Sequence, residues 1–268
     1  MKQILLAFQF LTIVPVKVSG SVSEKDIARS VVFFPVAGVF QGLLAGCVAF
    51  ASAIIFPPEI TPGLVLLTLI LSNGGFHLDG LADTFDAISV KSSGDFESDK
   101  EKRLSVMKDS STGAIGTTAI LFVILLKYLS LSNISHFTPF TYYSTLFLMP
   151  VISKWTMVVS MFHGKSARAD GLGQIFLSRT GLKEVSISTL LSILIFVLPV
   201  IFSGHFLPDF QFVFYPVLLA AMYILCRLLV AFFNKKFGGL TGDTLGAISE
   251  LTETAFLFMV IIWLRLFI

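Results

Sequence analysis

The stretch TPGLVLLTLILSNGGFHLDGLADTFD, residues 61–86, joins an apolar segment directly to an acidic one. Its first part, residues 61–71, is apolar but shorter than the roughly 20 residues that a helix needs to cross a hydrocarbon core. It runs into Asn73-Gly74-Gly75, and irregular backbone within a membrane protein is tolerated where it lines a cavity. The stretch therefore predicts a membrane-embedded helix that breaks at a ligand site.

Apolar runs in the rest of the chain predict a polytopic membrane protein. Hydrophobic residues make up 55% of the 268 residues and charged residues only 13%, and the mean hydropathy of +0.87 lies outside the range of soluble domains. The further runs long enough to span are 31–56, 112–131, 138–162, 185–203, 212–233 and 251–268. We expect an all-α bundle of roughly six to eight transmembrane or half-membrane helices, forming one domain over residues 1–268.

The N-terminus and the two cysteines carry no separate functional signal. The apolar start, residues 4–16, is short and lacks a small-residue cleavage site, so we expect no cleavable signal peptide. Cys47 and Cys226 both lie inside apolar runs. We therefore expect small buried hydrophobic side chains there, with no disulfide and no metal role.

The connections between the predicted spans alternate in character. Long, charged connections occur at 73–111, 163–184 and 234–250, whereas short ones without Lys or Arg occur at 57–60, 132–137 and 204–211. The positive-inside rule places the long connections in the cytoplasm. Because every polar motif below lies at this side, the sequence predicts one cytoplasm-facing site assembled from three loops.

The acidic part of the first stretch is the strongest candidate for a metal site. Asp79, Asp83 and Asp86 are spaced i, i+4 and i+7, so they fall within roughly 60° on one helix face. Converging carboxylates raise one another's pKa unless a cation lies between them, and oxygen ligands suit magnesium. A solvated helix face is the alternative, although uncompensated acids among apolar residues are costly. His77 is a candidate proton carrier, a hydrogen-bond donor to phosphate or a polar residue at the membrane boundary.

The second polar motif, MKDSSTGAIG at residues 107–116, leads into a predicted span. Serine and threonine at a helix start cap the helix, and its free amides with the helix dipole form an anion site. Gly113 and Gly116 would let a phosphate or a neighbouring helix approach closely. Ordinary capping and helix packing explain the motif as well, whereas Lys108 and Asp109 favour a role near phosphate and metal.

The third polar motif lies in residues 163–173, where basic side chains alternate with glycines. Lys165, Arg168 and Asp170 fall within it. Basic residues between glycines suit phosphate oxygens. A topology signal in a flexible loop is the alternative explanation.

The fourth polar motif, GGLTGDTLG at residues 238–246, contains four glycines and Asp243. Such a composition indicates a tight turn whose amides can face a phosphate. Glu250 and Glu253 follow at i and i+3 spacing, so one helix face presents two more acids at the mouth of a span.

Several basic residues lie within the predicted spans or near their ends. They are Lys127, Lys154, Arg227 and Arg265. Snorkelling explains those near the ends, while Lys154 and Arg227 lie deeper, where interior pairing or contact with substrate is expected.

Taken together, the polar residues favour metal-assisted transfer of a phosphoryl-type group, in which carboxylates, bases and glycine-rich turns position phosphates. The chain has no Gly-x-Ser-x-Gly elbow, no Cys/His nucleophile pair and no P-loop. Hydrolytic and P-loop classes are therefore disfavoured.

The motifs together resemble one family, the cobalamin synthases, or adenosylcobinamide-GDP ribazoletransferases. The matching segments are residues 74–87, residues 107–110 with Gly113 and Gly116, Arg168 with residues 171–173, and residues 238–247 with Glu250. Their order and spacing hold from residue 33 to residue 253, which is nearly the whole chain. The pair Ser111-Thr112 departs from the family pattern of a longer or basic residue followed by an aliphatic one, which weakens the case for a phosphate contact from that turn.

The resemblance implies the last assembly step of cobalamin, which completes the nucleotide loop. Adenosylcobinamide-GDP would be joined to α-ribazole, or to α-ribazole 5′-phosphate, with release of GMP. The ribazole 3′-hydroxyl would attack the cobinamide-side phosphorus in a magnesium-dependent reaction at the cytoplasmic face of the bacterial or archaeal cytoplasmic membrane. The expected partners are these small molecules and the lipid bilayer, with no nucleic acid; a homo-oligomer or an association with other corrinoid-pathway enzymes is compatible with the resemblance.

The resemblance also suggests roles for individual residues. The expected metal ligands are Asp79, Asp83, Asp86, Asp243 and Glu250. The expected catalytic residues are Asp83, Asp243 and His77, of which the last two compete as the base. The expected phosphate-binding residues are Lys108, Asp109, Arg168, Gly239, Thr241 and Gly242. The segment 87–111 is expected to close over the substrate as a lid.

Three other classes share part of the pattern. CDP-alcohol phosphotransferases share Asp-Gly-x-x-Ala, but their signature has Arg where this chain has Asp83, and the segment 91–95 lacks their two further aspartates. An intramembrane prenyltransferase shares the spacing of Asp79 and Asp83 but needs a second aspartate-rich motif. A cation transporter would place acids in mid-span, whereas here nearly all of them lie in or beside the long connections.

Overall fold

The structure is a computed structural model that describes residues 1–202 and 211–267. The described residues form helices and no strand, which confirms the all-α prediction. In chain order the helices are α1 (Lys2–Leu11), α2 (Glu24–Ser30), a 3-10 turn (Val31–Phe33), α3 (Phe34–Ile55), α4 (Thr61–Ser72), α5 (Phe76–Ser89), α6 (Phe96–Val106), α7 (Ala114–Ile134), α8 (Pro139–His163), α9 (Leu172–Arg179), α10 (Leu182–Phe202), α11 (Gln211–Phe237) and α12 (Gly242–Phe267).

Six helical segments are long and apolar enough to cross a membrane. They are Glu24–Ile55, Ala114–Ile134, Pro139–His163, Leu182–Pro199, Val213–Phe237 and Gly242–Phe267. The short helices α4 and α5 pass the same test only as a pair, and they are bent by 87° at their junction. The expected bundle with one broken helix is therefore confirmed, and α5 lies outside the six candidate spans.

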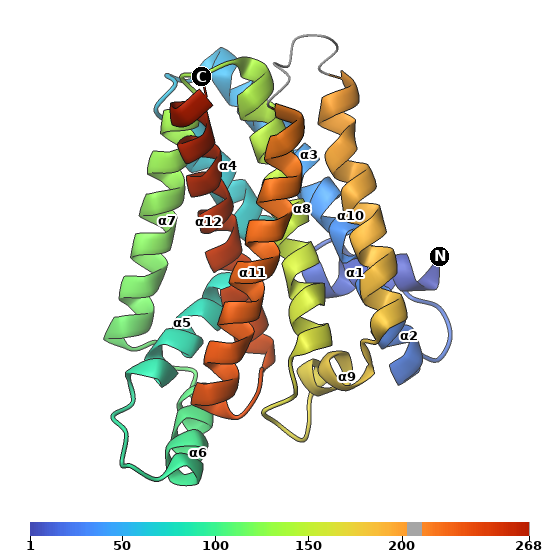
Figure 1. Cartoon of the computed structure of the whole chain (residues 1–268), viewed down its shortest axis with the longest axis vertical. Coiled ribbons are helices and arrows are strands. Elements are labelled where there is room, and N and C mark those ends of the chain that lie inside the picture. Colours follow the sequence, from blue (N-terminus) through green and yellow to red (C-terminus); the bar gives the residue numbers. More distant parts are fainter. Residues whose placement is uncertain (203–210, 268) are drawn as a thin grey trace.

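Helix α8 forms the core of the bundle and packs against α3, α10, α11 and α12 (Figure 1). In its apolar window 89% of the residues are buried, compared with 28% in the windows of α7, α10 and α11. The outer faces of those three helices present large apolar side chains such as Leu121, Leu194 and Leu228. This distribution is typical of a membrane protein: apolar side chains face the hydrocarbon, and polar side chains lie inside the bundle.

The three long connections gather at one end of the bundle, together with α6 and α9, while the C-terminus lies at the other end (Figure 1). Two of these connections are more helical than expected, since α6 occupies much of 87–111 and α12 begins at Gly242. Only residues 238–241 separate α11 from α12, so the predicted start of the last span at residue 251 is wrong by nine residues. Its charged residues can remain helical because they are paired inside the bundle. The predicted short connection at 204–211 falls almost wholly outside the described residues.

The two cysteines differ in environment. Cys226 is buried, as expected, and lies 3.0 Å from the Ser160 hydroxyl. Cys47 is exposed on α3, contrary to expectation, because an apolar run in a membrane bundle can face lipid as well as the protein core.

Candidate active site

The acidic helix α5 begins at a sharp break that is built by three residues. Gly74 and Gly75 adopt φ values of +69° and +76°, in the left-handed region that favours glycine. The side-chain oxygen of Asn73 accepts a hydrogen bond from the amide of Gly75 at 2.9 Å. The break turns the chain through 87°, so α5 leaves the direction of α4 and packs across α12 instead.

Two glycines let α5 and α12 approach each other closely. A Cβ added at Gly80 would lie 2.7 Å from the carbonyl oxygen of Asp243, and one added at Gly246 would lie 3.2 Å from the Cα of His77. Any larger residue would push the two helices apart. This crossing brings Asp243, at the start of α12, beside the acidic face of α5.

Three carboxylates lie close enough at this crossing for Asp79 and Asp243 to act electrostatically on Asp83, and we refer to Asp79, Asp83 and Asp243 as the acidic group. Asp79 is exposed and Asp83 is half-buried. Burial, followed by the charges of Asp79, Asp243 and Asp86, raises the pKa of Asp83 to about 6, against an opposing effect of Arg168. The acidic group therefore has an excess of negative charge, which a bound cation would relieve.

Arg168 is the basic partner of the acidic group. Its Nη2 atom lies 3.2 Å from Oδ2 of Asp243, and both side chains are partly exposed. A short parallel bridge holds this segment against the turn before α12: the amide of Leu240 donates to the carbonyl of Lys165 at 2.7 Å, and the amide of Ala167 donates to the carbonyl of Leu240 at 2.8 Å. The third and fourth polar motifs are therefore brought together, as one site requires.

The glycine-rich turn is largely occupied by protein contacts. A Cβ at Gly239 would lie 2.5 Å from the carbonyl oxygen of Lys165, so this glycine serves close packing. Thr241 is buried, and its hydroxyl accepts from the amide of Thr244 at 3.2 Å and lies 3.2 Å from Asp243 Oδ2. Gly242 is exposed beside the acidic group. Among the three predicted phosphate-binding residues of this turn, only Gly242 therefore presents an open surface.

Asp86 lies next to the acidic group but is engaged by the start of α7. Its Oδ2 accepts from the amide of Gly113 at 2.7 Å, and its Oδ1 accepts from the amide of Gly116 at 2.8 Å. The helix N-terminus that the sequence offers as a phosphate site thus holds a carboxylate of the same chain. The predicted metal ligand, Asp86, and the predicted anion site at this turn therefore bind each other in the structure.

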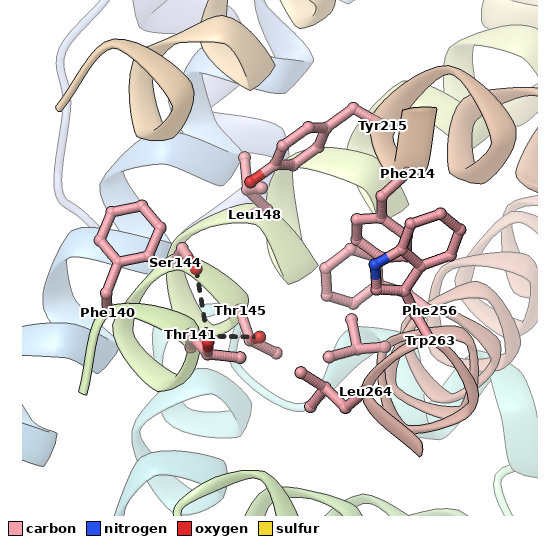
Figure 2. A pocket seen from close by; sticks show the side chains of 11 residues that line it. Phe140, Thr141, Ser144, Thr145, Leu148, Phe214, Tyr215, Phe256, Trp263 and Leu264 are labelled. Carbon is pink, nitrogen blue, oxygen red and sulfur yellow. Dashed lines mark hydrogen bonds between the residues drawn. The ribbon is translucent and has the colours of Figure 1, made fainter. Parts of the chain in front are cut away.

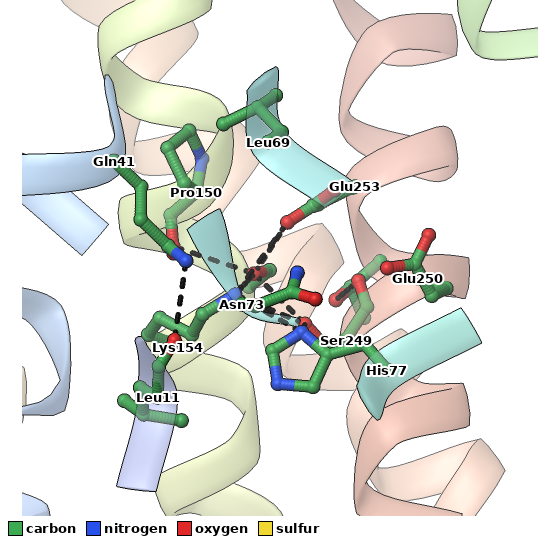
Figure 3. Close-up of polar contacts among 12 residues, drawn as sticks. Leu11, Gln41, Leu69, Asn73, His77, Pro150, Lys154, Ser249, Glu250 and Glu253 are labelled. Atoms are coloured by element: carbon green, nitrogen blue, oxygen red, sulfur yellow. Dashed lines mark hydrogen bonds and ion pairs between the residues drawn. The ribbon is translucent and has the colours of Figure 1, made fainter. Parts of the chain in front are cut away.

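His77 and Glu250 lie in a second polar region, on the opposite side of α5 within the bundle. We refer to Lys127, Lys154, Glu250 and Glu253 as the buried charge cluster. Lys127 Nζ lies 2.7 Å from Glu250 Oε2 and 2.6 Å from Glu253 Oε2. Lys154 Nζ lies 3.7 Å from Glu253 Oε1 and 3.5 Å from Nδ1 of His77 (Figure 3). Glu250 is therefore grouped with lysines, away from the acidic group, because a buried carboxylate requires a partner.

The expected convergence of the acids on a single point is not found. In the described part of the chain, no three His, Cys, Asp or Glu side chains come together in an arrangement that could hold a metal ion. The spacing of an ideal helix puts three carboxylates on one face of α5, but the amides of α7 turn one of them, Asp86, away. Asp243, which approaches from α12, is paired with Arg168. The acidic group retains carboxylate oxygens of the type that magnesium prefers.

A polar cleft of about 320 Å³ borders Arg168. It is lined by Glu101, Leu104, Ser105, Lys108, Ala167, Arg168, Ala169 and Asp170. Lys108 and Arg168, both predicted to bind phosphate, therefore face one space. Asp109 is exposed and does not line it; its carboxylate accepts from the amide of Ser111 at 3.0 Å, which lowers the pKa of Asp109.

Helix α6, which forms one wall of the cleft, was expected to be a loop. The carboxylate of Asp95 accepts from the amide of Ser98 at 2.8 Å, a helix-capping pattern that is visible in the sequence. Arg103 donates to the carbonyl of Lys236 at 3.1 Å and fixes α6 to the end of α11. Hydrogen bonds from Ser92 and from the amide and hydroxyl of Ser93 lower the pKa of Asp99 to about 2. The segment expected to act as a lid is thus docked through several contacts.

Figure 2 shows a second pocket, whose volume is about 40 Å³. It lies at the other end of the bundle, since Trp263 and Leu264, near the end of α12, line it. Aromatic and aliphatic side chains of α8, α11 and α12 line it, among them Phe140, Leu148, Tyr215 and Phe256. It has no charged lining residue, and it is remote from the start of α12 that carries Asp243. We therefore place the candidate active site at the acidic group and the adjoining cleft.

Comparison with known proteins gives one consistent result. A family model described as cobalamin-5-phosphate synthase matches residues 3–261. A protein of Thermodesulfovibrio yellowstonii named adenosylcobinamide-GDP ribazoletransferase is 34% identical over 94% of this chain and 93% of its own length. Proteins of the same name from Thermoanaerobacter pseudethanolicus and Geotalea daltonii are 33% and 32% identical, over 94% and 92% of both chains. No solved structure matches the chain.

Proposed function

The chain belongs to the cobalamin-5-phosphate synthase family and is a transferase of cobalamin synthesis, and we propose that it joins adenosylcobinamide-GDP to α-ribazole, or to its 5′-phosphate, with release of GMP. The observation that carries the proposal is the acidic group beside a cleft that Lys108 and Arg168 line together with Glu101 and Asp170. Excess carboxylate charge at Asp79, Asp83 and Asp243 meets Arg168 and Lys108 in one region. Such a pairing suits a pyrophosphate substrate that brings its own negative charge and a divalent cation.

Magnesium is the cation that we propose for this site. Asp79 and Asp83 would hold it, since Asp79 is exposed and the pKa of Asp83 is raised by burial and then by neighbouring carboxylates. When bound, magnesium would neutralise charge on the pyrophosphate oxygens. Asp86 and Glu250 are proposed to act as structural groups, because their oxygens already have amide or lysine partners.

Asp243 is the proposed acceptor of the hydroxyl proton. In the structure its carboxylate is paired with Arg168 at 3.2 Å. A substrate phosphate would compete with Asp243 for the guanidinium of Arg168. Once Arg168 binds the phosphate, Asp243 would be free to take the proton of the ribazole hydroxyl. The new bond joins that oxygen to the cobinamide-side phosphorus, and the bond from the same phosphorus to GMP breaks. Arg168 and Lys108 would stabilise the charge on the departing GMP.

We also propose that the acidic end of the bundle faces the cytoplasm. The connections at this end carry basic residues, including Lys100, Lys102, Lys165 and Lys235. Cytoplasmic loops are enriched in such residues. This orientation would give the site access to water-soluble nucleotide substrates.

The test is GMP release by the purified protein in liposomes, supplied with adenosylcobinamide-GDP, α-ribazole and magnesium. We expect GMP and a cobamide to appear together, and both to be lost in the Asp83→Asn variant and after magnesium is removed by EDTA. Glu59→Gln, a change of an exposed acid in the short connection between α3 and α4, is the matched control and should retain activity. Consumption of a CDP-alcohol or a prenyl diphosphate instead would overturn the substrate assignment.

A further inference from the structure

The buried charge cluster is a group of four ionisable side chains that lies outside the candidate active site. Its two lysines and two glutamates come from α7, α8 and α12, and all four are buried. Two positive and two negative charges balance, so the cluster has no charge left over for a ligand. Buried ion pairs are often less stabilising than apolar residues of the same size, so we looked for a structural role that this cluster serves.

Lys154 is the member of the cluster that reaches α5. The side chain is 1% exposed, and its ammonium donates to the hydroxyls of Ser153 at 3.1 Å and Ser249 at 3.3 Å. It also lies 3.5 Å from Nδ1 of His77 (Figure 3). Since an ammonium can only donate, Nδ1 is the acceptor in this contact.

Ser249 supplies the second contact to the same histidine. Its hydroxyl lies 3.3 Å from Nδ1 of His77, and because the hydroxyl oxygen already accepts from Lys154, its hydrogen can be donated to the ring. His77 is 5% exposed and belongs to the first turn of α5. The single lone pair of Nδ1 is shared between these two donors, one on α8 and one on α12, so the first turn of α5 is linked to both helices.

The contact of His77 with Lys154 and Ser249 lies close to the acidic group along α5. His77 precedes Asp79 by two residues, and its Cα packs against Gly246 of α12. Three residues further along α5, Gly80 packs against the backbone of Asp243. The first turn of α5 is thus held by close packing and by a polar contact on the side away from the acids.

We propose that His77 is a positioning residue: Lys154 and Ser249 hold its Nδ1 atom, and through it the first turn of α5, so that Asp79 and Asp83 stay beside Asp243. The role rests on the proposed function of the acidic group. It replaces the proton-transfer role that the sequence suggested for His77, since the ring is enclosed by the bundle and its Nδ1 atom is directed at an ammonium and a hydroxyl. The balanced charges of the cluster keep Lys154 in place as a fixed donor.

The test compares four variants by steady-state GMP release. His77→Leu and Lys154→Met remove the contact, and we expect kcat to fall by roughly tenfold to a hundredfold with KM changed by less than about threefold, because misplacing catalytic groups by about 1 Å has effects of this size. His77→Asn keeps an acceptor close to the position of Nδ1, and it should retain at least about a third of the parent kcat. Thr156→Val removes a comparably buried hydrogen bond between α8 and α12, the 3.0 Å contact to Thr252, without touching α5, and should behave as the parent.

A second readout is independent of activity. Spin labels at Ser89→Cys on α5 and Lys235→Cys on α11, both exposed positions, report the placement of α5 by pulsed electron spin resonance. The background carries Cys47→Ser and Cys226→Ala so that only the labelled sites react. We expect a narrow distance distribution in the parent, His77→Asn and Thr156→Val, and a broader or shifted one in His77→Leu and Lys154→Met.

The outcomes separate this proposal from the proposed function. If His77→Asn is as inactive as His77→Leu while its distance distribution stays narrow, His77 acts in chemistry and the positioning role is wrong. If His77→Leu changes neither readout, the positioning role is also wrong. If the parent itself releases no GMP, the proposed function fails, and the spin-label distances alone decide the positioning role. Should His77→Leu fail to fold, Ser249→Ala takes its place, with the same expected broadening and loss of kcat.

Discussion

The acidic group and the buried charge cluster lie on two sides of the same helix, α5, and both are completed by α12. The acidic group has an excess of negative charge, with Asp79 exposed and Asp83 half-buried. The buried charge cluster is balanced, buried in the bundle and paired within the chain. An unbalanced, accessible group gains by binding an outside cation, whereas a balanced, enclosed group gains nothing from one. Charge balance and access, more than the number of acids, therefore distinguish a ligand site from a scaffold.

The largest effect on activity should come from Asp83→Asn. Loss of a carboxylate that holds magnesium removes several kcal/mol of charge stabilisation, so we expect the rate of GMP release to fall by about a thousandfold. Thermal stability should be unchanged or slightly higher, because one of several mutually repelling charges is removed. If Asp83→Asn unfolded the protein instead of removing only its activity, the acidic group would be part of the scaffold, like the buried charge cluster.

The largest effect on stability should come from Lys127→Met. This change leaves Glu250 without a basic partner in the bundle, and an unpaired buried charge costs about 3–5 kcal/mol. The melting temperature in detergent should fall accordingly. Adding Glu250→Gln rebalances the cluster, since Glu253 still faces Lys154, and should recover much of the loss. No recovery in the double variant would show that charge balance is not what holds the cluster.

Asp86→Ala should have an intermediate effect on stability and tests whether Asp86 belongs to the acidic group. Its carboxylate accepts from two amides at the start of α7, and loss of such a helix cap costs about 1–2 kcal/mol. Activity should fall far less than in Asp83→Asn when the two are measured side by side at saturating magnesium. Equal losses in the two variants would instead place Asp86 among the metal ligands.

The smallest effect is a pH dependence of stability in metal-free buffer. The folded protein keeps the proton of Asp83 up to about pH 6, whereas the unfolded chain releases it near the ordinary value of 3.8. Because the folded state binds more protons in this window, Asp83 makes folding less favourable as the pH rises from about 4 to about 6. Asp83→Asn should lack this component, which melting curves recorded in EDTA at about pH 4.5 and about pH 6.5 would reveal.

The sequence predicted the helical membrane fold well because hydrocarbon imposes simple rules. Apolar runs of span length, the broken helix at Asn73-Gly74-Gly75 and the gathering of charged connections at one end all follow from the cost of exposing polar groups to lipid. The helix at Phe96–Val106 was missed because a polar, charged helix has no apolar period to reveal it, although Asp95 carried a capping signal.

The order of residues along the chain was enough to predict the family, the polytopic helical class and the set of polar residues from which any site must be built. Which of those residues are neighbours depends on how the helices pack. Asp86 turns to the amides of α7, Glu250 pairs with Lys127, and Asp243 joins Asp83 through a crossing that Gly80 permits. Spacing along one helix fixes only the direction in which a side chain leaves the backbone. Its partner depends on which other helices lie there, and long-range packing alone settles that.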